Sequence, residues 1–219
     1  MKKLTLLVTI LFSIAQASFA QQDAKAREIL DAMSAKYQKM NSFKADIEQK
    51  IFSVAQNQQL GSMEIEATVK GDKYRLKIGD QIIYNNTETV WTYMKDIEEV
   101  NVSNANNSAE SLLSAPSKIY TIYKDGFKYL YMGTKSEDGT TYHVVDLSPN
   151  KDIKANFYKL TMYIDTKDNS LTKWEVFEKG NQTRYLFTVK DFKQNVSVTD
   201  ADFEFSVKAN PDVEVVDLR

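Results

Sequence analysis

The 219-residue sequence contains no cysteine, only three prolines and only seven glycines. Without cysteine no disulfide can form, so the stability of the fold must come from its core alone. The chain also lacks an excess of charge, since 28 lysine and arginine residues face 30 aspartate and glutamate residues. A surface with this balance is not suited to holding a polyanion, and we therefore expect no nucleic-acid partner.

The sequence signatures of common enzyme classes are missing as well. With no cysteine and one histidine, His143, the chain cannot assemble a histidine metal site or a standard catalytic triad. Carboxylates recur two residues apart, at Asp46 and Glu48 and at Glu64 and Glu66, but we interpret them as the solvent-facing side of half-buried strands. The sequence predicts a protein that is not an enzyme and binds no metal or cofactor.

The longest apolar run lies at the N-terminus. Two lysines precede an apolar stretch over residues 4–15, and residues 18–20 (Ser-Phe-Ala) offer small side chains where a signal peptidase reads them. The stretch is too short to span the hydrocarbon core of a bilayer, about 30 Å thick, as a helix. We expect residues 1–20 to be a signal peptide and residues 21–219 to form a single soluble, monomeric domain in the bacterial periplasm.

Hydrophobic periodicity predicts one helix followed by many strands. Residues 24–40 repeat apolar side chains at three- and four-residue spacing, with Asp23 as the N-cap. Two short helices joined at Pro116, over residues 109–114 and 117–124, interrupt the strands. Alternating patterns predict strands at residues 43–48, 63–69, 74–78, 82–84, 90–94, 127–132, 140–147, 157–165, 171–178, 183–192 and 203–207.

Strands that follow one another through short turns favour an antiparallel meander. Two helices cannot cover a flat sheet of this length, so we expect an α+β fold, mainly antiparallel β, in which an incomplete, open barrel is covered by a helical lid. An excess of large aromatics would then line an apolar cavity for a lipid-like ligand; they are Tyr74, Trp91, Tyr93, Tyr120, Tyr129, Tyr131, Phe157, Tyr163, Trp174, Phe177 and Phe187. Which face of residues 90–94 points into that cavity stays open, because both faces carry large side chains.

Several weak motifs occur in a fixed order along the chain. They are SFKADIEQ at residues 42–49, Gly61, KGDKYRL at 70–76, VWTY at 90–93, LSP at 147–149, and DADFEF at 200–205 followed by residues 213–217. Together they resemble the LolA-type outer-membrane lipoprotein carriers over nearly the whole chain after the signal peptide. The resemblance implies an incomplete antiparallel barrel closed by a helical lid, with the acyl chains of a lipoprotein inside and no catalysis.

Residue roles follow from combining the strand pattern with this resemblance. The expected cavity residues are Met63, Ile65, Tyr74, Leu76, Trp91, Tyr93, Tyr129, Tyr131, Tyr163 and Trp174, and the expected lid residues are Leu112, Leu113, Pro116, Ile119 and Tyr120. Lys70 stands where the family tends to have an arginine that holds the empty form closed. Since a lysine offers a point charge rather than a rigid fork of donors, we predict a weaker or different latch.

The expected function is that of a carrier. It would take acylated lipoproteins from an inner-membrane lipoprotein-releasing transporter, shield their acyl chains, and pass them to an outer-membrane acceptor. Two alternatives remain open, a carrier of another lipid or pigment precursor and a regulatory protein that senses mislocalised lipoproteins.

Overall fold

The computed structural model describes residues 23–105, 116–180 and 182–219. Helix α2 (Ala24–Gln38) precedes a 12-stranded sheet of order β12-β6-β5-β4-β3-β2-β1-β11-β10-β9-β8-β7. The strands are β1 (Phe43–Ser53), β2 (Gln58–Lys70), β3 (Lys73–Ile78), β4 (Gln81–Asn85), β5 (Thr89–Met94), β6 (Glu99–Asn104), β7 (Phe127–Glu137), β8 (Thr140–Pro149), β9 (Phe157–Asp165), β10 (Leu171–Glu178), β11 (Thr183–Gln194) and β12 (Glu214–Asp217). Four 3-10 helices are described: η2 (Pro116–Tyr120), η3 (Ile122–Lys124), η4 (Asp200–Phe203) and η5 (Val207–Ala209).

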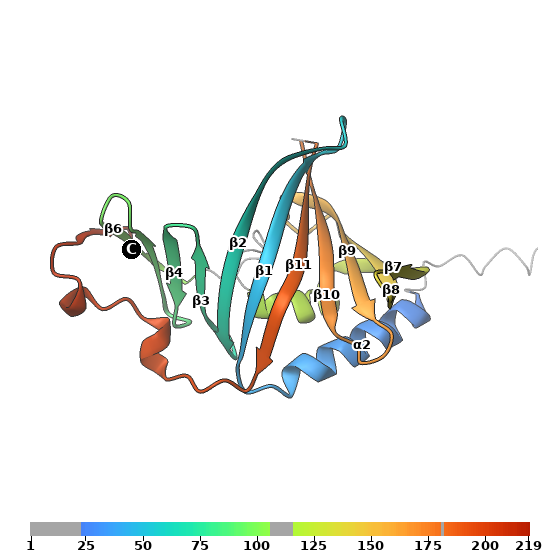
Figure 1. Ribbon diagram of the computed structural model, residues 1–219, viewed down its shortest axis with the longest axis horizontal. Coiled ribbons are helices and arrows are strands. Elements are labelled where there is room, and N and C mark those ends of the chain that lie inside the picture. The colour runs from blue at the N-terminus through green and yellow to red at the C-terminus, as the bar shows by residue number, and fades with distance from the viewer. Residues whose placement is uncertain (1–22, 106–115, 181) are drawn as a thin grey trace, which may run out of the picture.

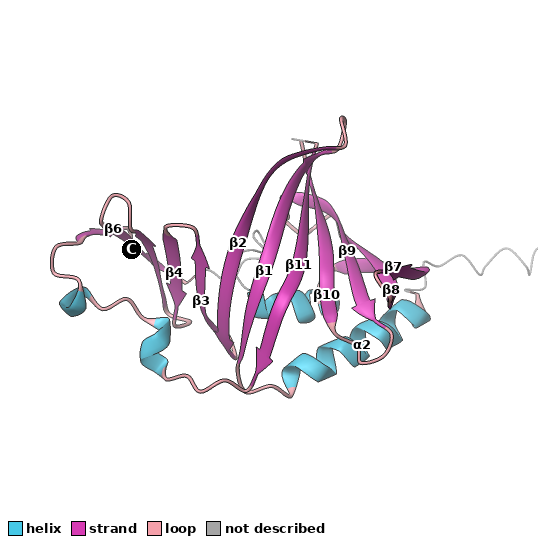
Figure 2. Ribbon diagram, in the orientation of Figure 1, coloured by secondary structure: helices cyan, strands magenta, loops and turns pink. Residues whose placement is uncertain are grey.

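The sheet is strongly curved and open, with β12 and β7 at its two edges (Figures 1 and 2). All neighbouring strands run antiparallel except β12 and β6, which run parallel. The predicted mainly antiparallel, open sheet is thereby confirmed. The expected lid residues Leu112 and Leu113 lie outside the described part of the chain.

The predicted single meander needs a correction. Strand β1 pairs with β11 as well as with β2, so two meanders, β1 to β6 and β7 to β11, meet at the centre of the sheet. A pattern of alternation identifies strands but carries no information on which distant strands pair. As a consequence, the chain passes from β6 to β7 between opposite halves of the sheet, and η2 and η3 belong to this connection.

The main core lies on the concave face of the sheet. Strand β1 buries Phe43, Ala45 and Ile47 there and exposes Lys44 and Asp46 on the other face. Helix α2 closes one side of the core with its apolar stripe, Ala26, Ile29, Leu30, Met33 and Tyr37. The predicted N-cap is confirmed, because Asp23 accepts hydrogen bonds from the backbone N–H groups of Lys25 and Ala26.

A second, smaller core lies on the outer face of strands β4 to β6. Leu76 of β3 faces the main core, so its neighbours Arg75 and Lys77 face outward. Their partners across the ladder, Tyr84 and Ile82 of β4, therefore face outward as well. The partners of these two residues on β5, Trp91 and Tyr93, lie on the same outer side. Val100 and Val102 of β6 continue this apolar surface.

The segment after β11 covers this second core. The rings of Tyr93 and Phe205 lie 5.0 Å apart, those of Tyr84 and Phe205 lie 6.1 Å apart, and Phe203 is fully buried. The predicted strand at residues 203–207 is therefore wrong. The two phenylalanines anchor an irregular segment with η4 and η5 on the outer face, and the terminal strand is β12. Strand β6 was not predicted, since only Val100 and Val102 mark it in the sequence.

We predict that Phe205→Ala lowers the free energy of unfolding by about 3 kcal/mol, because it removes a buried ring from the outer core. Val207→Ala, two residues further along, should change it by no more than about 0.5 kcal/mol, because Val207 is 46% exposed. Urea unfolding of both variants measures the difference. Equal losses would show that the C-terminal segment does not pack on the sheet as described.

Candidate functional site

An apolar cavity lies between the concave face of the sheet and η2. Its lining residues are Phe43, Ala45 and Ile47 of β1, Ile65 and Ala67 of β2, Leu76 and Ile78 of β3, Trp174 and Val176 of β10, Phe187 and Val189 of β11, and Pro116, Ile119 and Tyr120 of η2. The cavity volume is about 50 Å³, which is room for a few water molecules. None of the lining residues in the described part of the chain is charged.

Two alanines create the hollow at the centre of the floor. Ala45 of β1 and Ala67 of β2 face each other across the ladder, and Leu76 is the next residue across on β3. Methyl side chains at the two central positions leave space that larger residues would fill. On the same face, in the strands on the β11 side of β1, the rings of Trp174 and Phe187 stack with their centroids 5.0 Å apart and form one wall of the cavity.

The roof of the cavity is η2, which begins at Pro116 and carries Ile119 and Tyr120 toward the floor. The ring of Tyr120 stacks on that of Tyr37 at 3.6 Å and meets Phe43 edge to face at 5.9 Å. Burial raises the pKa of Tyr37 to about 12 and raises the pKa of Tyr120 as well. Both hydroxyls are therefore neutral at physiological pH, and the roof brings no charge into the cavity.

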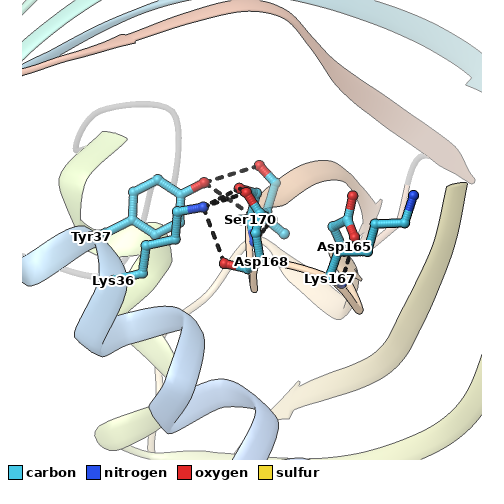
Figure 3. A network of polar contacts seen from close by, with 7 residues as sticks. Lys36, Tyr37, Asp165, Lys167, Asp168 and Ser170 are labelled. Carbon is cyan, nitrogen blue, oxygen red and sulfur yellow. Dashed lines mark hydrogen bonds and ion pairs between the residues drawn. The ribbon is translucent and has the colours of Figure 1, made fainter.

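Helix α2, on which the roof rests, is fixed to the turn between β9 and β10. Figure 3 shows Lys36 reaching Asp168, with Nζ 2.7 Å from Oδ2, and also Ser170. The Tyr37 hydroxyl accepts a hydrogen bond from the backbone N–H of Leu171 at 3.0 Å. The roof therefore stacks on a helix with its own polar anchors, whereas η2 contacts the floor through apolar side chains.

The polar residues singled out in the sequence lie outside the cavity. Glu48 is on the outer face of β1 and binds Lys190 at 2.8 Å, which lowers the pKa of the carboxyl group. His143 of β8 lies 3.2 Å from the Tyr131 hydroxyl. Within the described ranges, no three histidine, cysteine or acidic residues are grouped so that they could hold a metal ion.

Several of the residues predicted for the cavity and lid lie on it. Ile65, Leu76 and Trp174 line the floor and wall, and Pro116, Ile119 and Tyr120 form the roof. Four more are on the same face beyond the cavity. Tyr74 and Tyr129 are buried in the main core, Tyr131 packs against its edge, and Met63 is 38% exposed further along β2.

Three assignments are corrected. Trp91 and Tyr93 belong to the core on the outer face, because their register partner strand β4 presents Tyr84 and Ile82 there. Tyr163 is also on the outer face, opposite Lys173 of β10, and the Lys173 ammonium lies 4.5 Å from its ring centroid. Large aromatics on both faces of a strand cannot be assigned to one side from composition.

Other cavity residues were missed by the search for large aromatics. They are Phe43, Ala45, Ile47, Ala67, Ile78, Val176 and Val189, whereas Phe187 was among the large aromatics suggested for the cavity. The alternation at residues 43–47 already marked an inner face, and small residues at the centre of that alternation were the available signal for a hollow.

Lys70, the predicted latch, contacts the C-terminal segment. Its Nζ and that of Lys73 each lie 3.1 Å from Oδ1 of Asp200 at the start of η4, and the two lysines lower the pKa of that carboxyl group. Within the described residues, no hydrogen bond connects Lys70 to η2. The ammonium group thus ties the turn between β2 and β3 to the segment that covers the outer face.

Comparison with known protein families decides the assignment of the chain. The family described as "Outer membrane lipoprotein carrier protein LolA" matches residues 16–178, well over half of the 219-residue chain. The chain belongs to the LolA family. The resemblance seen in the sequence motifs is thereby confirmed. No curated protein sequence matches this LolA-family chain significantly.

A solved structure shares the fold of this LolA-family protein. An uncharacterized conserved protein from Thermus thermophilus is similar with a TM-score of 0.58 and 13% identity, over 88% of this chain and 99% of that chain. A LolA superfamily protein from Nitrosomonas europaea is similar with a TM-score of 0.44 and 12% identity, over 82% of this chain and 97% of that chain. None of the helices in the described part of the chain has the length and apolar character needed to cross a membrane.

We predict that Ala67→Phe weakens binding of the hydrocarbon dye diphenylhexatriene about tenfold or more, because the new ring fills the hollow. Thr68→Phe adds the same ring one residue along β2, on the outer face, and should bind the dye as the unaltered protein does. Fluorescence titration measures both affinities. If the two variants bind alike, the dye does not enter this cavity.

A second prediction concerns Lys70. Since its ammonium group binds Asp200 and not η2, Lys70→Ala should leave the affinity for diphenylhexatriene unchanged. It should also change the free energy of unfolding by less than about 1 kcal/mol, as expected for an exposed ion pair. A large rise in the rate of dye exchange, measured by stopped flow, would restore the latch role.

Proposed function

We propose that this LolA-family protein is a periplasmic carrier that holds the acyl chains of lipoproteins in the cavity under η2 and moves them from the inner to the outer membrane. The single observation that carries the proposal is the uncharged, mainly apolar lining that five strands and one short roof helix of the described chain give that cavity. The predicted signal peptide and the family membership support it.

The lining suits acyl chains on energetic grounds. Each methylene group that leaves water contributes about 0.8 kcal/mol, so a long chain binds tightly without any directional contact. Aliphatic and aromatic walls also tolerate chains of different shape, as a carrier of many different lipoproteins requires. Catalysis plays no part in this proposal.

Loading requires η2 to move, and this is why we assign it the role of a lid. Pockets for small molecules commonly enclose about 300–1,000 Å³, whereas the closed cavity has about 50 Å³. A neighbouring, more polar pocket of about 320 Å³, whose lining includes Asp72 and Lys118, shares Phe43 and Tyr120 with the cavity. If Tyr120 leaves its stack on Tyr37, the two spaces join, and the combined volume reaches the range of ligand sites.

The same energetics explain why partners are needed at both ends of the route. A chain held by many methylene contacts leaves slowly unless another apolar surface receives it. We therefore propose an inner-membrane lipoprotein-releasing transporter as donor and an outer-membrane acceptor as recipient, each of which displaces η2 on docking. The protein itself acts as a monomer.

Mass spectrometry of the protein purified from its own cells without detergent tests the proposal. We expect acylated lipoproteins to co-purify in near-stoichiometric amounts with the chain cleaved after residue 20. The Ala67→Phe variant should carry far less of this cargo, and the Thr68→Phe variant should carry as much as the unaltered protein. Free lipid or a pigment precursor in place of lipoproteins would contradict the lipoprotein role and indicate a carrier for another lipid.

A further inference from the structure

Gln49 is a polar side chain on an otherwise apolar face. On β1 it follows Phe43, Ala45 and Ile47 at two-residue spacing, so it lies on the concave face above the three cavity residues. It is 4% exposed, which is unusual for glutamine. It is also the last buried residue of the strand, because every position from Lys50 to Ser53 is partly exposed.

The strands beside Gln49 offer its amide no strong hydrogen-bonding side chain. Across the ladders it faces Phe187 of β11 and Met63 of β2, neither of which offers a strong hydrogen-bonding side chain. Tyr185, two residues before Phe187 on the same face of β11, donates its hydroxyl hydrogen to Glu178 at 3.2 Å. Within the described residues, no hydrogen bond involves the Gln49 side chain. The amide is not among the fully buried side-chain groups that lack a partner, so the small exposed part of Gln49 includes its amide, which a ligand on the concave face can reach.

Gln49 lies between the apolar cavity and the exposed end of the β1 and β2 hairpin. Below it lies the apolar cavity, and above it the concave face opens to solvent at Met63. Residues 51–63, which form the upper part of the β1 and β2 hairpin, contain no charged side chain. In an ester-linked acylated molecule, carbonyl groups join the hydrocarbon chains to the polar part. If the chains fill the cavity, these carbonyl groups come to lie beside Gln49.

We infer that Gln49 is a specificity-determining residue whose side-chain N–H group donates a hydrogen bond to an ester carbonyl of the acylated cargo. The acyl chains then run down the concave face past Ile47 toward Phe43 and Tyr120, and the peptide part leaves at the Met63 end. This inference rests on the proposed function. It adds recognition of an acyl ester to a cavity whose other residues recognise only hydrocarbon.

The test compares two ligands and two proteins. The ligands are a synthetic diacylated lipopeptide with ester linkages and its dialkyl ether analogue, which has the same chains but no ester carbonyl. The variants are Gln49→Met, which keeps the length of the side chain and removes the amide, and the matched control Gln59→Met on exposed residue Gln59 of β2. Thermal unfolding first establishes that Gln49→Met is folded, and its midpoint should not fall, because no hydrogen bond is lost.

We expect the unaltered protein and Gln59→Met to bind the ester about three- to tenfold more tightly than the ether, the range for one neutral hydrogen bond. Gln49→Met should bind both ligands with the same affinity, close to that of the unaltered protein for the ether. A preference that survives in Gln49→Met, or no preference in the unaltered protein, overturns the role of Gln49. The absence of an ester preference in the unaltered protein overturns the role of Gln49 even if the Gln49→Met variant does not fold. If neither ligand binds the unaltered protein, the proposed function itself fails, and this result is distinct from the other two.

Discussion

The facing pair of alanines at the centre of the concave face is the constraint on which the site depends. Ala45 and Ala67 lie opposite each other where β1 and β2 pair, between strands that otherwise present large apolar side chains. A sheet so curved and so apolar would fill its own interior with bulky residues at these positions. Among the described residues, η2 covers the space that the two methyl groups leave, so that a displacement of this short helix converts a packed core into a binding site.

The open sheet supports this arrangement by using its two faces differently. Strands β1 to β3 and β7 to β11 bury their concave face against α2, η2 and η3, whereas β4 to β6 bury their outer face against the C-terminal segment. The ion pairs of Lys70 and Lys73 with Asp200 join that segment to the turn between β2 and β3. Each half of the sheet therefore has its own cover, and η2 can move without exposing the outer core. The polar anchors of α2 at Asp168 and Leu171 keep that helix in place when it does.

Much of the fold was predictable because periodicity reports local structure. The helix at residues 24–40 and most strands were found from spacing alone, since each buries one face against a core. Strand pairing was not predictable, because the contact of β1 with β11 joins residues far apart in the sequence. Trp91, Tyr93 and Tyr163 were placed in the cavity because their size suggested burial, but the outer face of the sheet buries large rings too: Tyr93 packs on Phe205 in the outer core, and Tyr163 of β9 lies under Lys173. The alanines of the floor and the amide of Gln49 give signals only when their neighbours across the ladder are known.

The chain contains two tryptophans, and their positions allow a direct test of the central claim that acyl chains enter the space under η2. Trp174 lines the cavity, and Trp91 lies on the outer face of the sheet. A lipopeptide whose acyl chains carry bromine atoms quenches tryptophan fluorescence only at short range. Quenching should persist in Trp91→Phe, in which Trp174 is the remaining tryptophan, and disappear in Trp174→Phe. Loss of quenching in Trp91→Phe together with quenching in Trp174→Phe would place the acyl chains on the outer face and contradict this account.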